Sequence, residues 1–334
     1  MFRGTASGIV IALFLGGCSG PAGMDLDPTP VNPTAVTETH LLSQGFKDFP
    51  AFEATNRTYS RANMQRRESS VTGVDDYAQF LGGAGDEVRI HRLDRKLAWT
   101  LDATKKQYTE CPLKGCSTPI PGKPPETKPA NRNHDAECRL KIGIKTFTIE
   151  QTGRKRSING FDTEQYAVQW QVVFKDNASR TATSTVSIDL WTTPVTTALR
   201  KAMTLEQNYA RARNAFPDLG EASVRSQKLP IEVGRMLNIY LSRSVSPTDR
   251  SNFLAGARTL DEVKGHPILM KVTWRFTGEA CSMDETMKNV GNKPLFVFMS
   301  EVKSFRLEAL HDSLFALTFP LSPFTFPLNP AIAG

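Results

Sequence analysis

The chain has 334 residues, of which 40% are hydrophobic and 22% charged, with a formal net charge of +7. This composition is too apolar for a disordered protein and too polar for a multispanning membrane protein, so it indicates one large globular domain or two small ones. Beyond residue 18, no apolar run approaches the roughly 20 residues that cross a bilayer.

The first segment of the chain has the pattern of a secretion signal that ends at a cysteine. Arg3 precedes the apolar run of residues 8–17, and Cys18 follows directly. A positive start, a short apolar stretch and small residues before the cleavage point are typical of a secretory signal. Leu15-Gly16-Gly17-Cys18 resembles the lipobox of bacterial lipoproteins, which implies cleavage after Gly17 and a diacylglycerol on the Cys18 sulfur. The alternative is an ordinary signal peptide in which the cysteine occurs by chance.

Residues 18–40 are expected to form a flexible tether between the lipid and a domain that begins near Leu41. Pro21, Pro28, Pro30 and Pro33 lie there among small and polar residues without apolar periodicity. Many lipoproteins retained in the inner membrane carry Asp after the lipidated cysteine, whereas this chain has Ser19. By that resemblance we expect anchoring in the outer membrane of a Gram-negative host, facing the periplasm or the cell surface.

Period-two alternation dominates the chain beyond Leu41 and predicts about nine to eleven half-buried strands. The clearest stripes are Leu97 to Leu101, Leu140 to Ile144, Tyr166 to Phe174, Ala182 to Leu190 and Ile268 to Phe276. Near the end of the chain, the phase of Phe296 and Phe298 is opposite to that of Phe305 and Leu307. This change of phase indicates either a β-bulge or two strands in succession.

Helices are expected in one block. Thr197 can cap a helix that runs to about Asn214, and Pro230 suits the first turn of a second. That second helix would carry one apolar stripe, formed by Val233, Met236, Leu237, Tyr240 and Leu241. A third helix would follow Ser246. The expected fold class is therefore α+β, with a curved antiparallel sheet or incomplete β-barrel under a lid of two or three helices. Its domain would span residues 41–319, and a Pro-rich tail would follow over residues 320–334. That tail would either lie extended across a sheet edge or offer a partner an apolar segment.

Four cysteines follow Cys18, three of them in a Pro-rich insert over residues 111–138. These are Cys111, Cys116, Cys138 and Cys281. An even number of cysteines in an exported protein predicts two disulfides, and three connectivities stay open. The alternative is a zinc site formed by Cys111, Cys116, His134 and Cys138. Oxidation outside the cytoplasm favours the disulfides, so no metal or cofactor is expected.

No catalytic pattern is recognisable. The chain lacks a G-x-S-x-G elbow, an H-E-x-x-H pair and a phosphate-binding glycine loop. We therefore expect a protein that is not an enzyme. Lys and Arg gather in residues 89–106 and 139–156, which gives either a solvated strand face or a basic face for anionic headgroups or an acidic partner. A translocated lipoprotein does not meet nucleic acid, so that partner is excluded.

Five short segments resemble the DUF4412 group of bacterial exported proteins, which is similar to the LolA/LolB-like lipoprotein-carrier fold. They are His91 to Glu110, Ser157 to Tyr166, Ile188 to Pro194, Gly265 to Met270 and Asp312 to Phe315. The resemblance covers Phe49 to Phe319. The cysteine insert and the tail depart from the group's compact pattern.

The resemblance implies an apolar cavity that holds an acyl chain or another lipid between sheet and helices. Trp170, Trp274 and the helical stripe from Val233 to Tyr240 would form its wall, unless these side chains simply fill a core. The competing interpretation is an accessory lipoprotein that scaffolds an envelope or secretion complex through its basic face and tail. A filled core with an exposed basic patch would favour this second interpretation.

Overall fold

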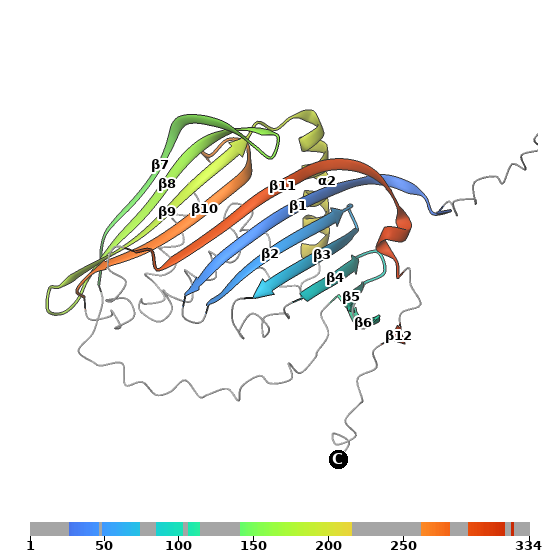
Figure 1. Cartoon of the computed structure of the whole chain (residues 1–334), viewed down its shortest axis with the longest axis horizontal. Helices are drawn as coiled ribbons and strands as arrows, with labels where there is room; N and C mark the ends of the chain where they lie inside the picture. Colours follow the sequence, from blue (N-terminus) through green and yellow to red (C-terminus); the bar gives the residue numbers. More distant parts are fainter. Residues whose placement is uncertain are drawn as a thin grey trace, which may run out of the picture.

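The protein is built mainly from one open antiparallel sheet, seen in the computed structural model (Figure 1). The structure describes residues 27–46, 49–73, 85–102, 106–113, 141–215, 262–280, 293–317 and 322–323. The first six strands are β1 (Val31–Phe46), β2 (Phe49–Ser60), β3 (Met64–Gly73), β4 (Gly85–Arg92), β5 (Leu97–Asp102) and β6 (Gln107–Pro112). The others are β7 (Lys141–Ile158), β8 (Phe161–Lys175), β9 (Thr181–Thr193), β10 (His266–Gly278), β11 (Phe296–His311) and β12 (Ser322–Pro323).

The sheet consists of two meanders that meet in its centre. The strand order is β12-β6-β5-β4-β3-β2-β1-β11-β10-β9-β8-β7, and every pair is antiparallel except β12 with β6. The chain thus starts at the centre with β1, runs outward to β6, and returns inward from the opposite edge, β7, to β11. Figure 1 shows the consequence, with the blue β1 and the red β11 side by side.

The first strand corrects the predicted tether. β1 begins at Val31, so the last ten residues of the proposed tether, 31–40, belong to a central strand. Pro33 is tolerated there because β1 pairs with β2 only from Ala35 onward, which leaves Pro33 bonded on one side alone. Ala35 and Val36 are both buried, so their succession hid the alternation on which the sequence prediction depended.

The predicted strand stripes are confirmed in β5, β8, β9 and β10. Along β8 every second residue from Tyr166 to Phe174 is buried, and Val168 faces Ile188 of β9, which in turn faces Val272 of β10. These rows form the largest apolar cluster of the described residues, together with Phe296 and Phe298. The slip in the last long strand is a bulge within β11, because Glu38 pairs with Ser304 while Thr39 pairs with Val302.

One α-helix lies within the described residues, α2 (Thr197–Asn214), between β9 and β10. Its N-cap is Thr196, not the expected Thr197, since the Thr196 hydroxyl accepts a hydrogen bond from the Leu199 amide at 3.2 Å. The helix packs on β11, β1 and β2, and it buries Leu199 and Ala202 against Ile268 and Phe305. A short 3-10 turn, η4 (Asp312–Phe315), follows β11 and covers an apolar cluster on β3, β4 and β5.

The expected α+β class and incomplete barrel are wrong: the fold is β-rich and the sheet is open. Closure would require the edge strands to pair, but β12 and β7 lie at opposite ends of the strand order. The prediction of a lid of two or three helices is also corrected. Within the described ranges only α2 is an α-helix, and the segments expected to form the second and third helices lie outside them. No helix in the described part of the chain is long and apolar enough to cross a bilayer.

Candidate functional site

The two tryptophans expected to line a ligand cavity are core residues. Trp170 and Trp274 belong to the large cluster on β8 to β11, with exposed fractions of 8% and 1%. The Trp274 indole donates a 2.9 Å hydrogen bond to the hydroxyl of Ser184, which is also buried. The other predicted wall residues lie outside the described residues: Val233, Met236, Leu237 and Tyr240. The predicted wall as a whole therefore stays a prediction.

The lipidation and cysteine predictions fall largely beyond the described ranges. Cys18, Cys116, Cys138, Cys281 and His134 all lie outside them. Cys111 lies within β6, where it is buried and faces Ala98 of β5. Within the described residues, no three His, Cys, Asp or Glu side chains gather in a way that could hold a metal ion. The two disulfides and their pairing stay predictions.

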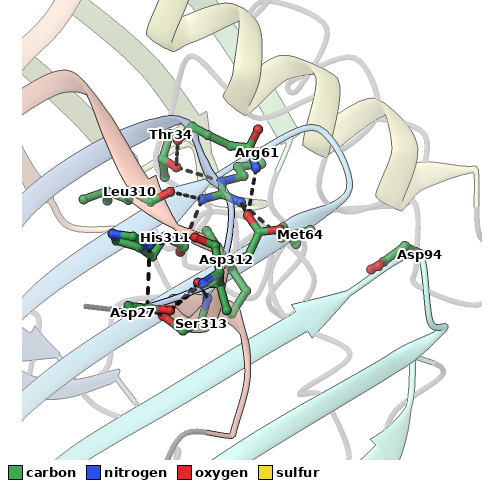
Figure 2. A network of polar contacts seen from close by, with 12 residues as sticks. Asp27, Thr34, Arg61, Met64, Asp94, Leu310, His311, Asp312 and Ser313 are labelled. Atoms are coloured by element: carbon green, nitrogen blue, oxygen red, sulfur yellow. Dashed lines mark hydrogen bonds and ion pairs between the residues drawn. The ribbon is translucent and has the colours of Figure 1, made fainter. Parts of the chain in front are cut away.

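A buried arginine joins the start of β1, the β2–β3 turn and the end of β11 (Figure 2). The guanidinium of Arg61 donates to the Thr34 hydroxyl at 2.8 Å, to the Leu310 carbonyl at 2.7 Å and to the carboxylate of Asp312. It also lies over the ring of Phe315, 4.6 Å from its centroid. These partners occupy the hydrogen-bond donors and the face of the guanidinium, so the role of Arg61 is structural.

Hydrogen bonds also hold the carboxylates of this network ionised. Asn32 and Arg61 lower the pKa of Asp312. Donation from Ser313 and Thr29 lowers the pKa of Asp27 to about 2. Because the donors and acceptors of the network pair with one another, we interpret it as a structural contact that holds the central strands together and not as a binding site.

A cluster of three arginines lies where the end of α2 meets the face of the sheet, and we call this junction the step. Arg67 of β3 and Arg89 of β4 lie directly opposite each other in the strand pairing, and both are exposed. Arg213, in the last turn of α2, acts electrostatically on Arg89. We call Arg67, Arg89 and Arg213 the basic cluster. Like charges placed opposite each other in a sheet are destabilising, so local folding does not explain this arrangement.

Neighbouring side chains fix the geometry of the basic cluster. The Asn56 side-chain oxygen accepts from Arg67 at 2.8 and 3.2 Å, and Arg89 forms an ion pair with Glu87 on its own strand. Although the Arg89 side chain is 54% exposed, desolvation by the surrounding residues and then the charges of Arg67 and Arg213 lower its pKa. The fold thus brings three cations together, and Glu87 pairs with one of them, Arg89.

A tyrosine–histidine pair joins the helix to this part of the sheet. The Tyr209 hydroxyl and Nδ1 of His91 form a hydrogen bond of 2.7 Å, and Tyr209 packs on Leu93 and Leu113. Burial, followed by the charges of Arg213, Arg89 and Arg67, lowers the pKa of His91 to about 4. Burial raises the pKa of Tyr209 to about 12. Both side chains are therefore neutral at pH 7, and they hold the end of α2 above β4 without adding charge.

Sequence reasoning identified residues 89–106 as a basic segment but missed the cluster. Arg67 and Arg213 lie in other segments, 22 residues before Arg89 and 124 after it in the numbering. Only the pairing of β3 with β4 and the packing of α2 bring the three side chains together. The period of two along a strand could have placed Arg89 and His91 on one face, but it could not have identified the residues that contact them from other segments.

Comparisons of the chain with protein-family models, with curated proteins and with solved structures find no match. The resemblance to the DUF4412 group and to the LolA/LolB-like fold therefore stays an expectation drawn from the sequence.

Proposed function

We propose that this protein is a non-enzymatic accessory lipoprotein of the bacterial envelope, which binds an acidic segment of a partner protein at the basic cluster. The observation that carries the proposal is the direct opposition of Arg67 and Arg89, with Arg213 at the end of α2 beside them. An incoming carboxylate would offset their repulsion, and arginine binds carboxylates in bidentate geometry. The lipid on Cys18 would hold the domain at the outer membrane.

The position of the basic cluster favours a peptide segment over a membrane surface. Arg67 and Arg89 project from the sheet face on which Tyr209 of α2 also rests, because His91 is two residues from Arg89 on the same strand. A packed helix stands about 10 Å high with its side chains. A flat membrane touching α2 would thus be held away from the two sheet arginines, whereas an extended acidic segment can enter the step.

The test uses the purified full-length protein in a non-ionic detergent and a fluorescent ten-residue glutamate peptide. We expect saturable binding that weakens about tenfold in the double variant Arg67→Gln/Arg89→Gln, and that also weakens as salt is raised toward 0.5 M. The matched control is Arg57→Gln/Arg306→Gln. It removes two exposed positive charges that lie outside the basic cluster, so binding should change less than about twofold.

Two results would overturn the proposal. One is an equal loss of binding in the control pair, which would indicate attraction by net charge alone. The other is binding to phosphatidylglycerol vesicles, but not to the peptide, that depends on Arg67 and Arg89. That result would indicate a lipid surface as the partner.

A second candidate function, binding of an acyl chain or lipid, is favoured by the extent of the apolar face on β8 to β11. It carries four large apolar side chains, Trp170, Phe174, Trp274 and Phe298. Native mass spectrometry of the protein purified without added lipid tests this function. A lipid-sized adduct lost on denaturation would support it, and a bare mass together with glutamate-peptide binding would leave the accessory function alone.

A further inference from the structure

A cavity of about 590 Å³ opens where the β7–β8 hairpin meets the segment that enters β10. Its charged lining comes from three places in the chain: Lys155 and Arg156 on β7, Asp162 and Glu164 on β8, and Lys264 before β10. The volume lies within the roughly 300–1,000 Å³ of small-molecule sites. None of these residues belongs to the basic cluster, so the cavity is a separate site.

A bulge in β7 breaks the strand pairing beside the cavity. Gln151 pairs with Tyr166, and the next pair is Lys155 with Glu164, so four steps along β7 match two along β8. Gly153 has a φ of 73° within this bulge. Bulges re-aim side chains and are frequent beside binding sites. Here the bulge separates two residues, Gln151 and Lys155, that both line the cavity.

Buried and half-buried polar side chains fix the bulge in place. The Thr152 hydroxyl donates to the side-chain oxygen of Gln165 at 2.8 Å, and the Gln165 amide donates to Asp189 of β9. At the next turn of the wall, the Thr163 hydroxyl donates to the main-chain oxygen of Arg156 at 2.7 Å. The cavity wall is therefore held by specific hydrogen bonds on the side that faces the sheet.

The charges of the cavity leave one cation in excess. Lys155 and Glu164 face each other in the strand pairing and offset one another. The guanidinium of Arg156 lies 4.0 Å from the centroid of the Trp191 ring, which fixes its position. Lys264 precedes Gly265, whose φ is 88° and where a Cβ would lie 2.6 Å from the Thr193 carbonyl oxygen. Only glycine allows this close approach, which brings Lys264 to the rim.

We propose that this cavity binds a small acidic sugar. Lys264 and Arg156 would hold the carboxylate, while Asp162, Glu164 and the hydroxyls of Ser157 and Thr192 would bind the sugar hydroxyls. The excess of one cation matches one carboxylate. Carboxylate acceptors on the opposite wall suit the many hydroxyl donors of a sugar and would repel a second anionic group.

The test is isothermal titration of the purified full-length protein with glucuronate and with glucose at equal concentrations. We expect a Kd on the order of 1 mM for glucuronate and at least about tenfold weaker binding of glucose. Lys264→Gln should weaken glucuronate binding at least about fivefold, and Ser157→Trp should abolish it by filling the cavity. Lys271→Gln, which removes an exposed lysine outside the cavity, is the matched control and should bind as the parent protein does.

We expect each variant to fold, because Lys264, Lys271 and Ser157 are all exposed. Thermal melts check this expectation. Equal binding of glucose and glucuronate, or no effect of Lys264→Gln in a folded variant, would refute the proposal. Tighter binding of glucose 6-phosphate than of glucuronate would assign the site to phosphorylated sugars and would also overturn it. Loss of peptide binding at the basic cluster has no bearing on these outcomes.

Discussion

Arg61, in the turn between β2 and β3, forms an ion pair with Asp312, which lies 251 residues further along the chain. The arginine side chain is 8% exposed and also bonds to Thr34 of β1 and to the last carbonyls of β11. One side chain thus fastens the two strands that the chain topology brings together at the centre of the sheet. The long separation means that neither meander can form this contact alone.

We expect Arg61→Gln to lower the free energy of unfolding by about 1–3 kcal/mol, because the Thr34 hydroxyl and the Leu310 carbonyl lose their donor, whereas the Asp312 side chain is 38% exposed and stays solvated. Arg57→Gln is the matched control, since it breaks an exposed pair with Glu38 and should cost less than about 1 kcal/mol. Urea denaturation followed by tryptophan fluorescence measures both. Equal values for the two variants would contradict the structural role of Arg61.

Stability should decline as the pH falls from about 6.5 to 4, because folding lowers the pKa of His91 and of His266 to about 4 in each case. A base with a lowered pKa stabilises the fold fully above its unfolded pKa, and this contribution is lost as the pH falls toward the folded value. Each histidine can change the free energy of unfolding by up to about 1.4 kcal/mol per pH unit in that window.

The variant His91→Gln separates this effect from other acid transitions. We expect its unfolding free energy to vary less than that of the parent protein between pH 6.5 and 4, measured by urea denaturation at each pH. His266→Gln should reduce the remaining slope. An unchanged slope in both variants would show that these imidazoles are not buried in their neutral form.

The N-cap of α2 can be assigned by paired substitutions. Thr196→Ala should cost about 1 kcal/mol, because the Leu199 amide loses its hydrogen-bond acceptor. Thr197→Ala should have little effect, since alanine is a good helix former at an exposed position. Thermal denaturation distinguishes the two, and the reverse order of stability would place the helix start at Thr197 instead.

Trp274 should behave as a core residue. We expect Trp274→Ala to lower the free energy of unfolding by about 3–5 kcal/mol, the range for deleting a buried aromatic side chain. Val31→Ala, at an exposed apolar residue, is the control and should change stability by less than about 0.5 kcal/mol. Should Trp274→Ala retain parent stability and bind a lipid less well, Trp274 would instead line a ligand cavity.

The sequence by itself determined the local structure of this protein. Alternation along Tyr166 to Phe174 and Ala182 to Leu190 is sufficient to predict β8 and β9, because the side-chain period of a strand is local. The change of phase between Phe298 and Phe305 left two possibilities, a β-bulge or two successive strands, and the structure has the bulge. The helix predicted to run to about Asn214 is confirmed as α2.

Only the tertiary structure decided the fold class and the two candidate sites. The pairing of β1 with β11 depends on contacts between residues more than 200 positions apart, and the strand order leaves β12 and β7 at opposite edges. Periodicity encodes neither of these features. For the same reason Arg67, Arg89 and Arg213, and likewise Arg156 and Lys264, become neighbours only once the strands have their register. A charged side chain carries no local signal of its distant partner, whereas an apolar one reveals the buried face of its own strand.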